Sequence, residues 1–270
     1  MNFTGILIAV AVVGGVGLLV GLFLGMAGIL FHVDVDEREE KILEALPGNN
    51  CGGCGYPGCS GLASAIAKGD APVNQCPVGG KPVADAIGKI MGVNAADTER
   101  MTAYVKCNGT LRKTEVYYEY SGIRDCRVLS YVPNKGEKYC TYGCLGYGSC
   151  VASCQFDAIH IVDGVAVVDK EKCKACGQCV AACPRHLIEL IPYSSKVTVA
   201  CHSCDKGPVT MKACDVGCIG CGICAKNCPA GAVTVENFHA HIDQSKCTQC
   251  GLCVEKCPKH SIHMESRKSE

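Results

Sequence analysis

Residues 218–229 read CIGCGICAKNCP and contain four cysteines in the spacing C-x2-C-x2-C-x3-C, followed directly by proline. Thiolates two residues apart can surround one corner of a metal–sulfur cluster, and the proline turns the chain away from it. The spacing is typical of chains that hold iron–sulfur clusters, with the fourth cysteine serving a second cluster. This stretch therefore predicts an iron–sulfur site.

A second run of the same kind, CTQCGLCVEKCP, occupies residues 247–258. Two such runs about thirty residues apart make one two-cluster domain of the bacterial ferredoxin type. In that arrangement the first three cysteines of each run share a cluster with the fourth cysteine of the other run. The predicted ligand sets are Cys218, Cys221 and Cys224 with Cys257, and Cys247, Cys250 and Cys253 with Cys228.

An earlier pair of runs repeats this pattern about 74 residues upstream. Its second run, residues 173–184, keeps the spacing and the final proline, whereas residues 140–154 have wider spacing and Gln155 in place of proline. In both pairs the residues between the runs, 158–168 and 232–242, predict a short β-rich link. The predicted sets are Cys140, Cys144 and Cys150 with Cys183, and Cys173, Cys176 and Cys179 with Cys154.

A cysteine-rich unit of a different spacing precedes these runs. Residues 51–59, CGGCGYPGC, form a glycine-rich loop, and helical patterns cover 36–45, 60–68 and about 83–91. Four cysteines suit one 4Fe–4S cluster, with a structural zinc ion as the alternative. The predicted ligands are Cys51, Cys54, Cys59 and Cys76.

Five cysteines remain: Cys107, Cys126, Cys201, Cys204 and Cys214. Four of them could hold a sixth cluster that joins the region before the first ferredoxin unit to the linker before the second. The alternative is that they are reduced structural thiols, since free cysteine packs well in protein interiors. We predict a cluster held by Cys107, Cys126, Cys201 and Cys214, and leave Cys204 out.

Composition supports metal ligation as the use of these cysteines. The chain has 270 residues with 25 cysteines, five phenylalanines and no tryptophan, so its apolar core would be thin and would need other stabilisation. Disulfides are the alternative, but the odd count and the repeated spacings favour ligation in a reducing compartment. With 26 basic and 26 acidic residues the chain carries no nucleic-acid footprint.

Two enzyme motifs do not apply to this sequence. No G-x-G-x-x-G lies between a strand and a helix, so we expect no NAD or flavin site in this chain. The spacing Cys214-x3-Cys218-x2-Cys221 matches that of radical S-adenosylmethionine enzymes. Two of these cysteines already belong to the ferredoxin run, however, and no long barrel follows. We expect no catalytic residue in this chain.

The N-terminal stretch predicts a membrane anchor. Residues 5–31 contain no charge and are long enough to span a bilayer, and the start of the chain lacks the basic region of a signal peptide. Arg38 and Lys41 place the following domains in the cytoplasm, which makes this a single-pass protein of the cell membrane. Gly17, Gly21 and Gly25 form consecutive G-x3-G steps, which predict packing against another transmembrane helix.

The predicted fold class is therefore α+β. It consists of a transmembrane helix (1–31), a small helical 4Fe–4S domain (32–95), a β-rich connector (96–139) with a strand at TEVYYEY (114–120), and two tandem bacterial two-cluster ferredoxin-like domains (140–192 and 214–265). A linker (193–213) separates the two domains, and a tail (266–270) follows them.

The order of these features resembles the RnfB subunits of the Rnf complexes along essentially the whole chain. The resemblance implies a membrane-bound ferredoxin:NAD+ oxidoreductase that couples electron flow to Na+ or H+ transport. It implies that this subunit takes electrons from soluble ferredoxin and passes them to integral membrane and flavin-bearing subunits. The four ligands in 51–76 and the two ferredoxin sets carry over as cluster ligands, giving five 4Fe–4S clusters, with the sixth outside the resemblance.

Two alternatives to this function stay open at the level of sequence. One is a ferredoxin-like electron-transfer subunit of a membrane reductase or hydrogenase that pumps no ion. The other is a structural zinc protein, which iron content would exclude.

Overall fold

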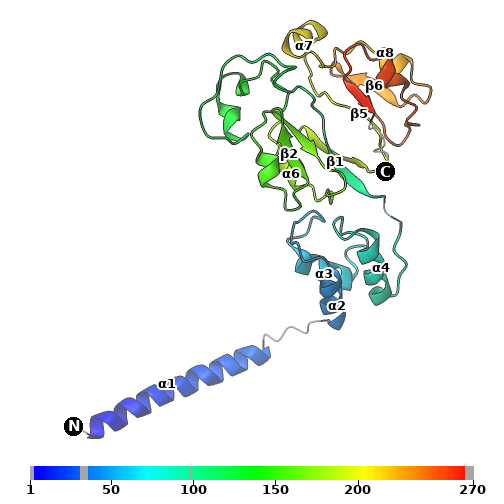
Figure 1. Ribbon diagram of the computed structural model, residues 1–270. Coiled ribbons are helices and arrows are strands. Elements are labelled where there is room, and N and C mark those ends of the chain that lie inside the picture. Colours follow the sequence, from blue (N-terminus) through cyan, green and yellow to red (C-terminus); the bar gives the residue numbers. More distant parts are fainter. Residues whose placement is uncertain (1–2, 31–35, 98, 265–270) are drawn as a thin grey trace.

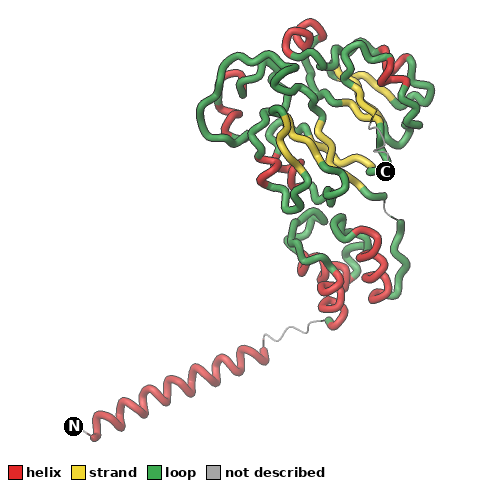
Figure 2. Tube along the Cα trace, in the orientation of Figure 1, coloured by secondary structure: helices red, strands yellow, loops and turns green. Residues whose placement is uncertain are grey.

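The computed structural model describes residues 3–30, 36–97 and 99–264 (Figure 1). The fold is mixed α+β, as predicted. A long helix stands apart at the N-terminal end, a small helical unit follows, and two β-containing units lie beyond it. Figure 2 shows the same division, because all strands come after residue 100. Three predicted features fall outside the described residues: the end of the anchor at residue 31, the end of the second ferredoxin-like domain at residue 265, and the tail 266–270.

Helix α1 (Phe3–Leu30) carries no charged residue. Within it, Val10–Leu30 has a mean hydropathy of 2.4 and is long and apolar enough to cross a membrane. Gly17, Gly21 and Gly25 have no atom within 4 Å of the position where a Cβ would lie, so this face is uncovered by the described chain. The helix is consistent with the predicted membrane anchor.

The small helical unit is built from three helices: α2 (Glu37–Ala45), α3 (Cys59–Lys68) and α4 (Gly80–Met91). Helix α2 begins after Asp36, whose carboxylate accepts a hydrogen bond from the backbone N–H of Arg38 at 2.9 Å and so caps the helix. Ile42, Leu62 and Ile87 are at most 1% exposed and form the core of the unit.

Each ferredoxin-like unit contains a β-hairpin flanked by two short helices. In the first unit these elements are α5 (Ser149–Ala152), β2 (Ile159–Val162), β3 (Val165–Val168) and α6 (Gln178–Ala182). In the second unit they are α8 (Ile223–Lys226), β6 (Val233–Glu236), β7 (His239–Ile242) and α9 (Leu252–Glu255). Both hairpins are antiparallel and fall in the links that the sequence predicted.

Strand pairing extends both units beyond these elements. Strand β1 (Met101–Val105) pairs antiparallel with β4 (Ile188–Pro192), so the first unit takes a strand from the predicted connector. Strand β5 (Val197–Val199) pairs with β8 (Ile262–Met264), so the second unit takes a strand from the predicted linker. Helix α7 (Gly207–Ala213) completes the segment between the units.

The rest of the connector is mostly loop, with two 3-10 helices, η1 (Val128–Tyr131) and η2 (Pro133–Lys135). The predicted strand at 114–120 is wrong. This segment makes only two isolated bridges, Thr114 with Cys214 and Val116 with Lys138. Val116 and Tyr117 are 45% and 56% exposed. Strand propensity depends on the neighbours that a segment packs against. The ring of Tyr117 stacks on that of Tyr139, but the segment forms no continuous ladder with another strand.

Candidate iron–sulfur sites

The cysteines of the helical unit define site A, which comprises Cys51, Cys54, Cys59 and Cys76. Three of them (Cys54, Cys59 and Cys76) pack against the core of this unit. Asn50 accepts a hydrogen bond from the backbone N–H of Cys59 at 2.8 Å, which anchors the glycine-rich loop to the start of α3. Burial raises the pKa of the Cys76 thiol, and the neighbouring Cys54 and Cys59 add to the rise.

The regular ferredoxin runs bring their cysteines together in the predicted groups. Site B is a cavity lined by Cys154, Cys173, Cys176 and Cys179. Site E is a cavity lined by Cys218, Cys221, Cys224 and Cys257. Site F comprises Cys228, Cys247, Cys250 and Cys253. Burial raises the pKa of the Cys253 thiol, and its neighbours Cys247, Cys228 and Cys250 add to the rise. In each unit the short helices begin at a glycine with positive φ, which lets the chain turn around the site (Gly177, Gly222 and Gly251).

The irregular run behaves differently from the prediction. Site C is a cavity lined by Cys126, Cys144, Cys150 and Cys183, so Cys126 stands where the spacing predicted Cys140. The backbone N–H of Cys126 donates to the Ser149 hydroxyl at 2.9 Å, and this hydroxyl donates to Asp125 at 2.8 Å. These hydrogen bonds hold Cys126 at the start of α5, beside Cys150.

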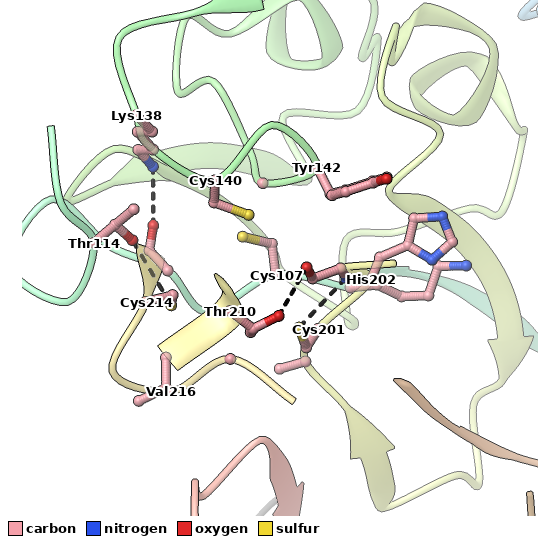
Figure 3. Close-up of a pocket in the computed structure, with 16 residues that line it drawn as sticks. Cys107, Thr114, Lys138, Cys140, Tyr142, Cys201, His202, Thr210, Cys214 and Val216 are labelled. Atoms are coloured by element: carbon pink, nitrogen blue, oxygen red, sulfur yellow. Dashed lines mark hydrogen bonds between the residues drawn. The ribbon is translucent and has the colours of Figure 1, made fainter. Parts of the chain in front are cut away.

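Cys140 lies in a separate cavity, site D, with Cys107, Cys201 and Cys214 (Figure 3). In the cavity of site D, Cys140 therefore stands where the sequence predicted Cys126. The chain around Cys140 is drawn there by backbone pairing: Tyr139 donates to the carbonyl of Glu115 at 2.8 Å, and Thr114 bridges to Cys214.

Cys204 does not line the cavity at site D. Its thiol lies 3.9 Å from the carbonyl oxygen of His202. The position agrees with leaving Cys204 out of the predicted ligands.

The thiols at these sites sit in surroundings that disfavour the free thiolate. Burial raises the pKa of Cys150 and Cys201 to about 12, and of Cys144, Cys179 and Cys224 to about 11. Desolvation penalises the charged form of a thiol, and neighbouring cysteines increase the penalty. Such groups ionise readily only when a cation compensates them, so metal binding would be coupled to proton release.

The six sites form a continuous series through the molecule. Cys51 of site A faces site B, because its carbonyl accepts a hydrogen bond from the Gln178 side chain. Sites B and C share helices α5 and α6, and sites E and F share α8 and α9. Between sites C and D, the backbone N–H of Cys144 donates to the sulfur of Cys107 at 3.3 Å. Sites D and E meet where the backbone of Cys218 hydrogen-bonds to Cys201.

Three family models match parts of the chain. They are described as "Putative Fe-S cluster" (residues 46–78), "4Fe-4S binding domain" (166–189) and "4Fe-4S dicluster domain" (217–261). These ranges contain cysteines of sites A, B, C, E and F. Site D lies outside all three matches.

Relatives with assigned functions match most of the chain. The B subunit of the Na+-translocating ferredoxin:NAD+ oxidoreductase complex of Acetobacterium woodii is 46% identical over 90% of this chain and 73% of its own length. The B subunit of an ion-translocating oxidoreductase complex of Methanosarcina acetivorans is 44% identical over 89% of this chain and 91% of its own. The B subunit of the proton-translocating ferredoxin:NAD+ oxidoreductase complex of Clostridium ljungdahlii is 40% identical over 86% and 82%.

These matches confirm the resemblance drawn from the motifs and favour it over the reductase and zinc-protein alternatives. Identity of 40–46% over 73–91% of the length of three relatives, each of them a B subunit of such a complex, shows the family. The chain belongs to the RnfB family, the iron–sulfur subunits of the ion-translocating ferredoxin:NAD+ oxidoreductase complexes known as Rnf complexes.

Proposed function

We propose that this chain, an iron–sulfur electron-transfer subunit of an ion-translocating ferredoxin:NAD+ oxidoreductase, holds six 4Fe–4S clusters at sites A to F. The observation that carries the number six is the cavity at site D, where four cysteines from four separate segments meet (Figure 3). A 4Fe–4S cluster held by four thiolates supplies a one-electron carrier.

The donor sets fit such clusters. Four cysteines, and no other metal-binding side chain in an equivalent position, surround each of sites B, C and E. Among the described residues, no three His, Cys, Asp or Glu side chains converge closely enough to hold a single metal ion. Thiolates that ring a cavity, rather than meet at one point, suit a cluster better than a zinc ion.

Iron analysis tests the number of sites. Six clusters of four irons predict about 24 iron atoms per chain in anaerobically purified protein, and five clusters predict about 20. Iron and acid-labile sulfide are measured together, with EPR of the reduced protein. A content near 20 irons would remove site D from the proposal and return its cysteines to structural thiols.

The proposed orientation places sites A to F on the cytoplasmic side of the membrane. Arg38 and Lys41, close to the end of α1, support this side. Helix α2 begins seven residues after α1 ends, a span of at most about 25 Å. Site A is therefore the site held nearest the membrane, and we assign it to the contact with integral membrane subunits. The glycine face of α1 would pack against the same subunits, and co-purification of a Gly21→Leu variant with them tests that contact.

The second ferredoxin-like unit is the proposed surface for soluble ferredoxin. Among the residues that the structure describes, Cys221 of site E and Cys250 of site F are the only exposed cysteines, so a partner can approach both sites closely. Lys226 and Lys256 are exposed beside them, and Lys259 lines site E. Lys246 also lies here, but Asp243 pairs with it at 3.1 Å and offsets its charge. An acidic ferredoxin would be drawn to this surface, chiefly through faster association.

Neutralising that charge should slow association. We expect the combined change Lys226→Gln, Lys256→Gln and Lys259→Gln to reduce the rate of reduction by acidic ferredoxin about tenfold at low salt. The difference from the wild type should shrink at high salt, where such charges are screened. The assay uses inside-out membrane vesicles with the complex assembled.

Two comparisons make this assay decisive. Lys68→Gln with Lys89→Gln, two exposed lysines of the helical unit, should leave the rate unchanged. Right-side-out vesicles should show no reduction if the orientation is correct. An unaltered rate and salt dependence in the triple variant would move the ferredoxin surface to the first unit.

A truncation after residue 194 is less informative, because it also removes Cys201 and Cys214 of site D.

A further inference from the structure

Lys138 is the only lysine, arginine, aspartate or glutamate among the buried residues of the described chain, and it is 2% exposed. Its ammonium donates hydrogen bonds to the carbonyl oxygens of Gly109 at 2.9 Å and Gly164 at 2.8 Å. Asp163 lies next to Gly164 in the sequence, but its carboxylate pairs with Arg112 at 3.0 Å. The buried ammonium is thus held in place by two neutral acceptors.

Such a placement is unfavourable unless negative charge lies nearby. Removing an ammonium from water costs several kcal/mol, and carbonyl groups offset only part of that cost. The Asp163 carboxylate, whose pKa is lowered chiefly by Arg112 and also by Lys138, supplies part of this compensation, and groups that become negative in the functional protein can supply the rest. The thiols around Lys138 are the groups of this kind that the structure provides.

Lys138 stands at the junction of two sites. Figure 3 shows the cavity of site D, which Lys138 lines together with Cys140 and Cys107. Toward site C, the Gly164 carbonyl that accepts a hydrogen bond from Lys138 lies against Gly146, where a Cβ would approach it to 2.6 Å, and Gly146 is two residues after Cys144. The two sites are themselves joined by the hydrogen bond from Cys144 to Cys107. The ammonium of Lys138 is therefore a fixed positive charge placed between the cysteines of site D and those of site C.

We propose that Lys138 is a positive charge shared by sites C and D, and that it raises the reduction potentials of the clusters at these two sites. The inference rests on the proposed function of sites C and D as cluster sites. An added electron increases the negative charge of a thiolate-bound cluster, and a buried cation nearby stabilises that charge. Site D is where segments of the two ferredoxin-like units meet, and site C lies next to it in the first unit, so Lys138 would make the clusters on both sides of this junction easier to reduce.

The test compares Lys138→Met, which removes the charge and keeps a long apolar side chain, with Lys138→Arg, which keeps the charge. Anaerobic redox titration followed by EPR measures the midpoint potential of each signal. Signals of sites C and D are assigned from their loss in Cys126→Ser and Cys140→Ser. In Lys138→Met we expect lower midpoints at sites C and D, with the reduced-to-oxidised ratio at fixed potential falling about tenfold. Signals of the other four sites should not move.

The matched control is Lys212→Met. Lys212 is exposed and lies two residues before Cys214 of site D, so solvent screens its charge and the midpoints should stay in place. Unchanged midpoints in Lys138→Met would overturn the inference. Equal downward shifts in the Met and Arg variants would also overturn it, because they would show a packing effect rather than a charge effect.

Cluster loss is also informative. If Lys138→Met lost about eight irons, from sites C and D alone, while Lys138→Arg kept them, the shared counter-charge would be supported in a stronger form. Loss of iron from all six sites would instead show a general folding role and contradict the inference. The iron content of the wild-type protein distinguishes the role of Lys138 from the proposal that sites C and D hold clusters. If the wild type contains about 24 irons and Lys138→Met leaves the midpoints unchanged, only the role of Lys138 is overturned. If the wild type lacks about eight irons, the proposed clusters at sites C and D are overturned as well.

Discussion

Replacing Cys140 by serine is expected to remove the cluster of site D, about four iron atoms, and to leave site C loaded. Replacing Cys126 by serine should do the reverse. The physical reason is the exchange of these two residues between sites: hydrogen bonding to Ser149 holds Cys126 with Cys150, and pairing of Tyr139 with Glu115 carries Cys140 toward Cys214. Sequence spacing alone predicts the opposite grouping.

Double variants distinguish the two groupings by iron content. Cys140→Ser combined with Cys107→Ser should lose about four irons in total if the residues share site D, and about eight if they belong to different sites. Cys140→Ser combined with Cys144→Ser should lose about eight irons by the structural grouping and about four by the spacing. Cys204→Ser is the control and should keep all of its iron. The reverse pattern in the two double variants would restore the grouping predicted from spacing.

Replacing Gly53 by valine is expected to separate site A from site B without removing iron from either. A Cβ on Gly53 would lie 2.6 Å from the carbonyl oxygen of Cys176, which is closer than atoms can approach. The contact between the helical unit and the first ferredoxin-like unit depends on this close approach and on the hydrogen bond from Gln178 to Cys51. Overpacking of this kind costs about 1–3 kcal/mol, which would weaken docking about 5- to 150-fold.

Hydrogen exchange measures this loss of contact. In Gly53→Val, amides of residues 51–55 and 175–178 should exchange faster, while the cores of both units keep their protection. Gly177→Ala is the matched control on the facing loop. It also replaces a glycine, in the left-handed region at φ 77°, but its Cβ would meet no atom within 4 Å. It should strain its own turn and leave the contact in place. Equal exchange in Gly53→Val and wild type would show that the units do not dock through this contact.

Much of the site architecture could be predicted from the sequence because it is local. In a ferredoxin run three ligands and the glycine that starts the short helix lie within a few residues, so their spacing determines their geometry. Sites B, E and F accordingly group as predicted. The long uncharged stretch in α1 and the three helices around site A are likewise properties of single segments.

Sites C and D could not be grouped this way, because their cysteines come from loops without periodicity. Cys140 is the first cysteine of the irregular run and Cys126 precedes that run, and only hydrogen bonds between distant segments assign Cys126 to site C and Cys140 to site D. The expected strand at 114–120 is wrong for a related reason: Val116 and Tyr117 are exposed although Thr114 is buried, and the segment has two isolated bridges in place of a ladder.

The sequence by itself therefore determined the family, the α+β class and the apolar N-terminal helix, and it predicted which cysteines lie together where they are neighbours along the chain. Only the tertiary structure decided which cysteine completes sites C and D, the approach of Gly53 to Cys176, and the burial of Lys138 between two sites. The division has a physical cause. Spacing along a chain specifies contacts within one turn or run, whereas contacts between runs depend on backbone pairing and packing that no single segment encodes.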